Sequence, residues 1–128
     1  MNNDINKIAD FMELGGQIRK GETFDVDSYD LACILEFVIE EINETTDAIH
    51  YHDLEEALDG FIDTAYVALT GAIALVGRDK AIRAWEQVVD VNLSKVDGRF
   101  GPPIIDADTG KIKKPRGWQP PNYDFLYD

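Results

Sequence analysis

The sequence predicts an all-α protein, a four-helix bundle followed by an irregular, proline-rich C-terminal tail. Two observations favour this fold. Apolar residues recur three or four positions apart through residues 4–93, which is the spacing of one helix face. All five prolines follow Val96, and proline interrupts helices, so no long helix is expected there. We expect residues 1–96 to form the bundle and residues 97–128 a tail packing on it or on a neighbouring subunit, within a single domain overall.

The first two helices are predicted from apolar stripes and from residues that favour helix ends. The first covers residues 4–14 and ends at Gly15-Gly16, because glycine favours turns over helix interiors. Its apolar stripe is Ile5, Ile8, Phe11 and Met12. The second begins after a cap at Asp27 or Ser28 and continues to about His50. Its apolar stripe is Leu31, Ile34, Leu35, Val38 and Ile42.

The third and fourth helices carry similar signals at their ends. Asp53 and Glu56 have the spacing of a capping box, with aspartate in place of serine or threonine. The third helix then continues to Gly77, whose lack of a side chain suits a C-cap. Asp79 is expected to cap the fourth helix, residues 80–93. The stripe of that helix is Ile82, Trp85, Val88, Val89 and Leu93.

The tail is expected to hold one small hairpin. Ile104-Ile105 and residues 111–113 flank a run of turn-forming residues at positions 106–110. The tail also carries large aromatic side chains, which favour packing over free movement in solvent. They are Trp118, Tyr123, Phe125 and Tyr127.

Charge is separated along the chain. The formal net charge is −13, which argues against a partner that is a nucleic acid or an anionic membrane. Residues 21–77 contain fourteen acids and no Lys or Arg, whereas nine of the twelve basic residues lie between Arg78 and Arg116. The first half can therefore hold a metal and the second can supply cations to a polyanion. An acidic surface that only aids solubility is the alternative.

Three further features favour a cytoplasmic protein. Cys33 is the only cysteine and lies in an apolar run, so we expect a small buried side chain and no internal disulfide. The polar N-terminus lacks the apolar core of a signal peptide. Residues 61–77 are the most apolar stretch, but they include Asp63 and two glycines. We expect a core or subunit-interface helix there and no membrane span.

Five carboxylates form the most informative pattern. Glu40, Glu41 and Glu44 lie on the second predicted helix, and Asp59 and Asp63 on the third. Residues three or four apart share a helix face, so each group presents its acids on one side. Two such helices packed together would bring at least four carboxylates to one place. That arrangement is repulsive unless a hard divalent cation such as Mg²⁺ lies among them.

An ordinary solvated helix face is the alternative interpretation of these acids. Three observations weaken it. Glu40 follows the apolar run C-I-L-E-F-V-I, where burial is expected, and no Lys or Arg lies nearby. A second acidic pair follows at a distance suited to an antiparallel helix. Asp63 has apolar neighbours, and a buried charge needs a partner or a metal.

The order of these motifs resembles that of the all-α nucleoside triphosphate pyrophosphohydrolases, which include MazG-like and phosphoribosyl-ATP pyrophosphohydrolase-like proteins. The resemblance spans residues 11–121 and rests on four stretches. They are E-E-I-N-E, D-G-F-I-D-T-A-Y-V-A-L-T-G-A, V-V-D-V-N-L-S-K and G-K-I-K-K-P-R-G-W-Q-P-P. The second, third and fourth look like those of the small phage-type members. Such proteins are commonly dimers or tetramers, so the resemblance implies a homodimer or homotetramer.

The resemblance assigns roles to the carboxylates. It implies that Glu41, Glu44 and Asp63 bind Mg²⁺, with Mn²⁺ as a substitute, and that Glu40 binds another metal or helps to activate water. Many members have Glu where this chain has Gly60. Asp59 is the replacement on the same face, which makes it a fourth metal ligand, and Glu56 is held in reserve.

Substrate-binding residues are expected in the fourth helix and the tail. The resemblance implies that Lys95 reaches a phosphate and Asn92 a phosphate or sugar, where a fraying helix end is the alternative. Lys111 and Lys114, with Lys113 and Arg116, are expected to close over the triphosphate or to remain solubilising charges. Trp118 is either a hydrophobic anchor or a stacking lid over the base. Tyr66, one turn after Asp63, is a hydrogen-bond donor near the metals.

The resemblance implies hydrolysis of a (d)NTP to a (d)NMP and pyrophosphate. A purine nucleotide such as dGTP is one candidate substrate. Water would attack the α-phosphorus, and Glu40 or Glu44 would take its proton. Glu40, Glu41 and Glu44 are thus the catalytic candidates. A ferritin-like di-iron protein is one rival, because Asp47 and His50 have suitable spacing, but it needs a second such pair. An acidic, non-enzymatic interaction protein is the other.

Overall fold

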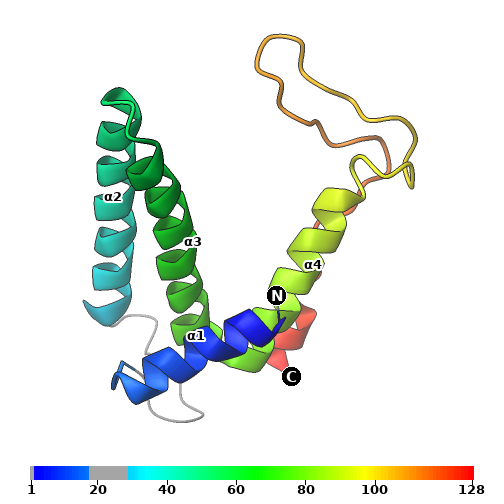
Figure 1. Ribbon diagram of the computed structural model, residues 1–128. Helices are drawn as coiled ribbons and strands as arrows, with labels where there is room; N and C mark the ends of the chain where they lie inside the picture. Colours follow the sequence, from blue (N-terminus) through cyan, green and yellow to red (C-terminus); the bar gives the residue numbers. More distant parts are fainter. Residues whose placement is uncertain (1, 18–28) are drawn as a thin grey trace. The chain divides into compact units, whose positions relative to one another are not determined.

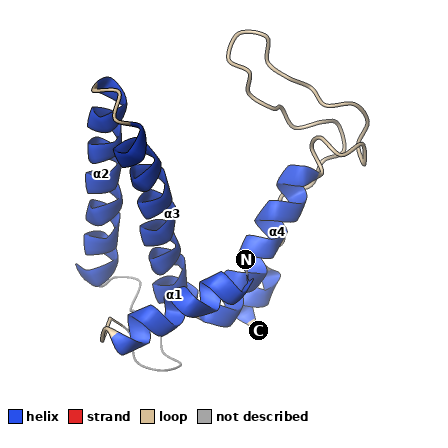
Figure 2. Cartoon of the chain, viewed as in Figure 1, coloured by secondary structure: helices blue, strands red, loops and turns tan. Residues whose placement is uncertain are grey.

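The protein is all-α, as predicted. A computed structural model describes residues 2–17 and 29–128, and Figures 1 and 2 show helices and loops but no strand in these ranges. The four helices are α1 (Asn2–Leu14), α2 (Tyr29–His50), α3 (Leu54–Val76) and α4 (Arg78–Leu93), followed by a short 3₁₀ helix, η1 (Asp124–Tyr127). These elements are consistent with a helical bundle. The chain divides into two compact units, Met1–Ala81 and Ile82–Asp128, and the expected division at residue 96 stays a prediction.

Helices α2 and α3 form an antiparallel hairpin in the first unit (Figure 1). The turn uses His52 in the left-handed region, with φ 56°. Asp53 caps α3 as predicted, because its side chain accepts a hydrogen bond from the backbone N–H of Glu56 at 3.1 Å. Gly77 closes the other end with φ 85°, and its N–H donates to the carbonyl of Ile73. Local end signals therefore set the length of α3. The predicted caps of α2, Asp27 and Ser28, lie outside the described residues.

Helix α1 packs against α3 and supplies much of the core. Ile5 and Met12 are completely buried and Ile8 is 5% exposed, as their spacing predicts. Phe11 departs from the predicted stripe, since its side chain is 52% exposed, although its ring makes a T-shaped contact with Tyr66 at 5.7 Å between centroids. It lies at the margin of the stripe, where α3 covers one side of the ring. The expectation of a buried Cys33 is also wrong, because its side chain is half-buried.

Helix α4 begins earlier than expected. The N–H of Ala81 donates to the carbonyl of Gly77, so the first turn opens at Arg78 and Asp79 lies inside it. The predicted cap at Asp79 is therefore wrong, because the glycine that ends α3 also starts α4. Arg78 pairs with Asp10 at 2.9 Å and Glu13 at 3.1 Å, which ties this turn to α1 within the first unit.

The tail packs on the part of α4 that belongs to the second unit. The indole N–H of Trp118 donates to the carbonyl of Val91 at 2.7 Å. The Arg83 guanidinium lies 4.3 Å from the centre of the Phe125 ring, and Phe125 is buried. In the stretch of sequence between α4 and Trp118, Ile105 and Ile112 form an isolated antiparallel bridge, which is the pairing expected of a small hairpin. Aromatic side chains thus anchor a segment with little regular structure.

Candidate active site

Gly60 lets α2 and α3 approach closely beside the carboxylates. It is buried, and a Cβ added there would meet Thr45, with the threonine Oγ1 nearest, its Cβ at 2.9 Å and its Cγ2 at 3.2 Å. The Thr45 hydroxyl donates to the carbonyl of Glu41 at 2.6 Å, and the Thr64 hydroxyl donates to that of Gly60 at the same distance. Both hydroxyls are therefore satisfied within their own helices. A side chain as large as glutamate has no space at position 60.

The five carboxylates lie around this contact on both helices. Glu41 and Asp63 are half-buried, and Glu40, Glu44 and Asp59 are exposed. The pKa of Glu41 is raised above its ordinary value of 4.5, first by desolvation. The charges of the four other acids raise it further, in the order Glu44, Asp63, Asp59, Glu40. Charges from both helices therefore act on the Glu41 carboxyl, but the predicted meeting of at least four carboxylates at one place is not found among the described residues.

The carboxylates do not form a preassembled cage. Within residues 2–17 and 29–128, no three His, Cys, Asp or Glu side chains lie close enough together to hold a metal ion. Like charges repel, so their long side chains keep apart. The same described residues offer these five acids no ion pair with a Lys, Arg or His. The metal-binding roles of Glu41, Glu44, Asp59 and Asp63 stay predictions.

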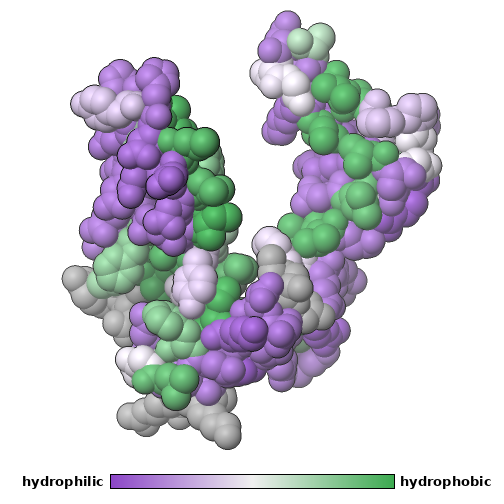
Figure 3. All heavy atoms as spheres, in the orientation of Figure 1, coloured by the Kyte–Doolittle hydropathy of each residue, from purple (hydrophilic) through white to green (hydrophobic). Residues whose placement is uncertain are grey.

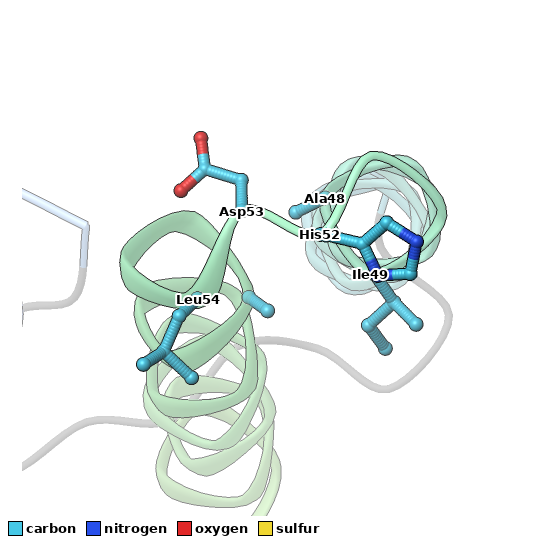
Figure 4. A pocket seen from close by; sticks show the side chains of 6 residues that line it. Ala48, Ile49, His52, Asp53 and Leu54 are labelled. Carbon is cyan, nitrogen blue, oxygen red and sulfur yellow. The ribbon is translucent and has the colours of Figure 1, made fainter.

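The two histidines, His50 and His52, do not add to the group of carboxylates. His50 and His52 are both exposed at the end of α2, and His50 contacts Tyr51 edge-on at 5.1 Å. Figure 4 shows a shallow pocket at the α2–α3 turn, where His52 lies beside Ile49 and the Asp53 carboxylate points away from the imidazole. No carboxylate–imidazole pair forms at this pocket. The arrangement gives no support to the di-iron alternative.

Four of the five predicted substrate-binding residues come together in the second unit. The Lys95 ammonium lies 3.0 Å from the Asn92 side-chain oxygen and 4.9 Å from the centre of the Trp118 ring. The Lys114 ammonium lies 5.3 Å from the centre of the same ring. Lys111 lies in the small hairpin, where its carbonyl accepts a hydrogen bond from the Asp106 N–H at 2.8 Å. Binding of substrate by all five stays a prediction.

Sequence reasoning missed a second charged cluster beside α4. Arg99 donates to both carboxylate oxygens of Asp90, at 3.1 and 2.9 Å, and to Asp97 at 2.8 Å. The pKa of Asp90 is lowered mainly by its hydrogen bond with Arg99. The pKa of Asp97 is lowered first by its bond from the Arg99 backbone N–H. No motif predicts this pairing, which fastens the start of the tail to α4.

A family comparison decides what the carboxylate helices represent. The model of the phosphoribosyl-ATP pyrophosphohydrolase family matches residues 14–77, which include α2, α3 and all five carboxylates. The chain belongs to this family. Phosphoribosyl-ATP pyrophosphohydrolases form part of the MazG-like all-α superfamily, so the resemblance found in the sequence is confirmed. No curated protein and no solved structure matches the chain.

Within the phosphoribosyl-ATP pyrophosphohydrolase family match, the close helix contact at Gly60 limits which residue this position can hold. The sequence resemblance led us to expect a glutamate at this position, and the contact with Thr45 leaves no space for one. Asp59 and Asp63 are the two acids that α3 offers beside this contact. The family match ends at Gly77, so the cluster around Trp118 depends on its own geometry.

The carboxylate set suits a hard divalent cation. Its donors are carboxylate oxygens, which Mg²⁺ and Mn²⁺ prefer over softer ligands. The pKa of Glu41 is raised by desolvation and then by the charges of the four other acids, and a positive ion would relieve the repulsion among these charges. The donor chemistry therefore fits the metal that the resemblance implies.

Proposed function

We propose that this chain is a Mg²⁺-dependent nucleoside triphosphate pyrophosphohydrolase that converts a (d)NTP and water into a (d)NMP and pyrophosphate. Its family supports a nucleotide pyrophosphohydrolase-like activity. The observation that carries the proposal is the placement of five acids on the facing helices α2 and α3, where desolvation and then the charges of the other four acids raise the pKa of Glu41. Clustered charge of this kind at a half-buried carboxyl is typical of functional sites.

The residues have distinct proposed tasks. Glu41, Glu44, Asp59 and Asp63 would hold Mg²⁺, which when bound supplies charge neutralisation and a more acidic water. Glu40 or Glu44 would accept the proton of the water that attacks the α-phosphorus. The bond from that phosphorus to the bridging oxygen then breaks, and pyrophosphate leaves. Tyr66, 36% exposed on α3, would donate a hydrogen bond near the reacting groups.

A nucleotide panel tests this proposal. Pyrophosphate release would be followed with Mg²⁺ or Mn²⁺ for the common NTPs and dNTPs, dGTP among them, and for phosphoribosyl-ATP, which the family name makes a further candidate. We expect turnover of at least one substrate and near-complete loss in Glu41→Gln. Asp4→Asn is the control that removes one acid, because Asp4 is an exposed acid in the first turn of α1, outside the two helices that carry the five carboxylates. Equal turnover by wild type and Glu41→Gln would remove the site assignment.

We also propose that the α2–α3 hairpin pairs with a second copy of the chain, in a homodimer or homotetramer. The hairpin leaves many large apolar side chains uncovered, and Figure 3 shows hydrophobic residues gathered along it. Those more than half exposed along α2 and α3 are Leu35, Ile39, Ile49, Leu54, Leu58, Phe61 and Ile62. A groove of about 450 Å³ between α2 and α3 adds Ile34, Val38 and Leu75. Exposed apolar surface of this extent marks an interface.

Membrane insertion is the competing explanation for this surface. By length and composition alone α3 could cross a membrane, which is weak evidence because the core helix of a soluble protein passes the same test. Asp59 and Asp63 lie within α3 and disfavour insertion. We expect sedimentation to give a dimer or tetramer, and Ile62→Glu to weaken it. A wild-type monomer that floats with lipid vesicles would contradict this proposal.

A further inference from the structure

Two lysines from different elements share one indole ring in the second unit. Lys95, just past the end of α4, and Lys114, in the tail, lie 4.9 and 5.3 Å from the centre of the Trp118 ring. The ring is itself held in place, because its N–H donates to the carbonyl of Val91 at 2.7 Å and its side chain is half-buried. The geometry is that of two cation–π contacts on one anchored ring.

Neither lysine has a carboxylate partner among the described residues, although the chain has 25 acids and 12 basic residues. Among the described residues, Arg78, Arg99 and Lys113 all form ion pairs, whereas Lys95 and Lys114 form none. Lys95 is instead held by the neutral side-chain oxygen of Asn92 at 3.0 Å. Two ammonium groups, each within 5.3 Å of the centre of one ring, therefore keep charges that no described carboxylate compensates.

Neutral partners position a lysine without cancelling its charge. A carboxylate in place of the ring would hold the ammonium groups more firmly but would neutralise them, and an incoming anion would then have to displace it. The indole and the Asn92 oxygen leave two positive charges available. Ammonium groups bind phosphate as point charges, and two of them suit neighbouring phosphates of one chain.

We propose that Trp118 is a positioning residue that sets Lys95 and Lys114 as a two-lysine clamp for the phosphate chain of an oligophosphate. This inference rests on the proposed function, since the physiological ligand would be the triphosphate of the substrate. Of the two roles expected for Trp118, it favours the anchor over the stacking lid, because the N–H and the ring are already engaged. Trp118 acts on the ligand through the lysines.

Binding of inorganic tripolyphosphate without metal tests the clamp. Titration calorimetry at low ionic strength should show binding to the full-length protein, weakened roughly tenfold by Lys95→Gln or Lys114→Gln, the loss expected for one charged contact. Trp118→Leu should weaken binding by a similar factor although it removes no charge, and Trp118→Phe should keep most of it because the ring remains. Lys7→Gln is the charge-matched control, since Lys7 is an exposed lysine on α1.

Three results would overturn the clamp: no binding by wild type, unchanged binding by Trp118→Leu, or equal weakening by Lys7→Gln. Thermal melts of each variant would exclude misfolding as the cause of a loss. With an active enzyme, Trp118→Leu should raise KM for the nucleotide and leave kcat unchanged. If the protein binds tripolyphosphate but hydrolyses no nucleotide, only the proposed function is contradicted. If it hydrolyses a nucleotide and Trp118→Leu leaves KM unaltered, only the clamp is contradicted.

Discussion

The close contact between Gly60 and Thr45 makes Gly60→Ala an informative perturbation. The new Cβ would lie 2.9 Å from the threonine Cβ and closer still to its Oγ1, so the helices must move apart by at least roughly 0.5 Å. Overpacking of this kind costs about 1–3 kcal/mol. Alanine regains about 1 kcal/mol over glycine in a helix interior. Taking the upper end for so short a contact leaves a net loss of about 2 kcal/mol, which corresponds to a fall in Tm of roughly 6–10 °C.

Gly71→Ala is the matched control for this variant. Gly71 lies in the same helix, and its added Cβ would lie 3.3 Å from the Ile34 Cγ2, which a small side-chain shift relieves. Gly71→Ala should therefore change the free energy of unfolding little, and Thr45→Ala should recover part of the loss in Gly60→Ala. Urea unfolding followed by circular dichroism measures all three. A Gly60→Ala protein as stable as wild type would refute a close helix contact at this point.

Two further predictions concern the core and the tail. Ile73→Ala removes a completely buried side chain and should lower the free energy of unfolding by about 2–5 kcal/mol, whereas Leu75→Ala, at a 44% exposed position of the same helix, should cost less in the same urea titrations. The pKa of Asp90 and of Asp97 is lowered in the folded protein, so their contribution to stability is present above the ordinary value of 3.8 and lost as pH falls below it. Arg99→Gln should flatten this acid limb in thermal melts between pH 2 and 5; an unchanged limb would contradict the pairing.

Local signals allowed much of the fold to be predicted from sequence. The ends of α3 follow from Asp53 and Gly77, which act within a few residues of the chain. The buried face of α1 follows from the spacing of Ile5, Ile8 and Met12. The exposure of Phe11 could not be predicted from this spacing. Spacing gives the centre of an apolar stripe, but not how far the neighbouring helix covers the edge of the stripe.

The sequence likewise predicts one part of the candidate site and not another. Helical spacing places Glu41 beside Glu44, and Asp59 beside Asp63, from sequence alone. The contact that brings these pairs together depends on Gly60 meeting Thr45, which belongs to another helix and carries no motif. The anchoring of Trp118 on Val91 spans 27 residues and likewise has no local signal. Contacts between distant residues are set by packing, which composition and periodicity do not specify.

Divalent metal binding at the α2–α3 acids is the most direct test of the proposed site. Calorimetric titration with Mg²⁺ and Mn²⁺ should give binding to wild type and to Asp4→Asn, and its loss in Glu41→Gln. The pKa of Glu41 is raised, so protons should compete with the metal and affinity should fall as pH is lowered through that pKa. Binding that is equal in wild type and Glu41→Gln, or absent from wild type at neutral pH, would contradict a metal site built from these carboxylates.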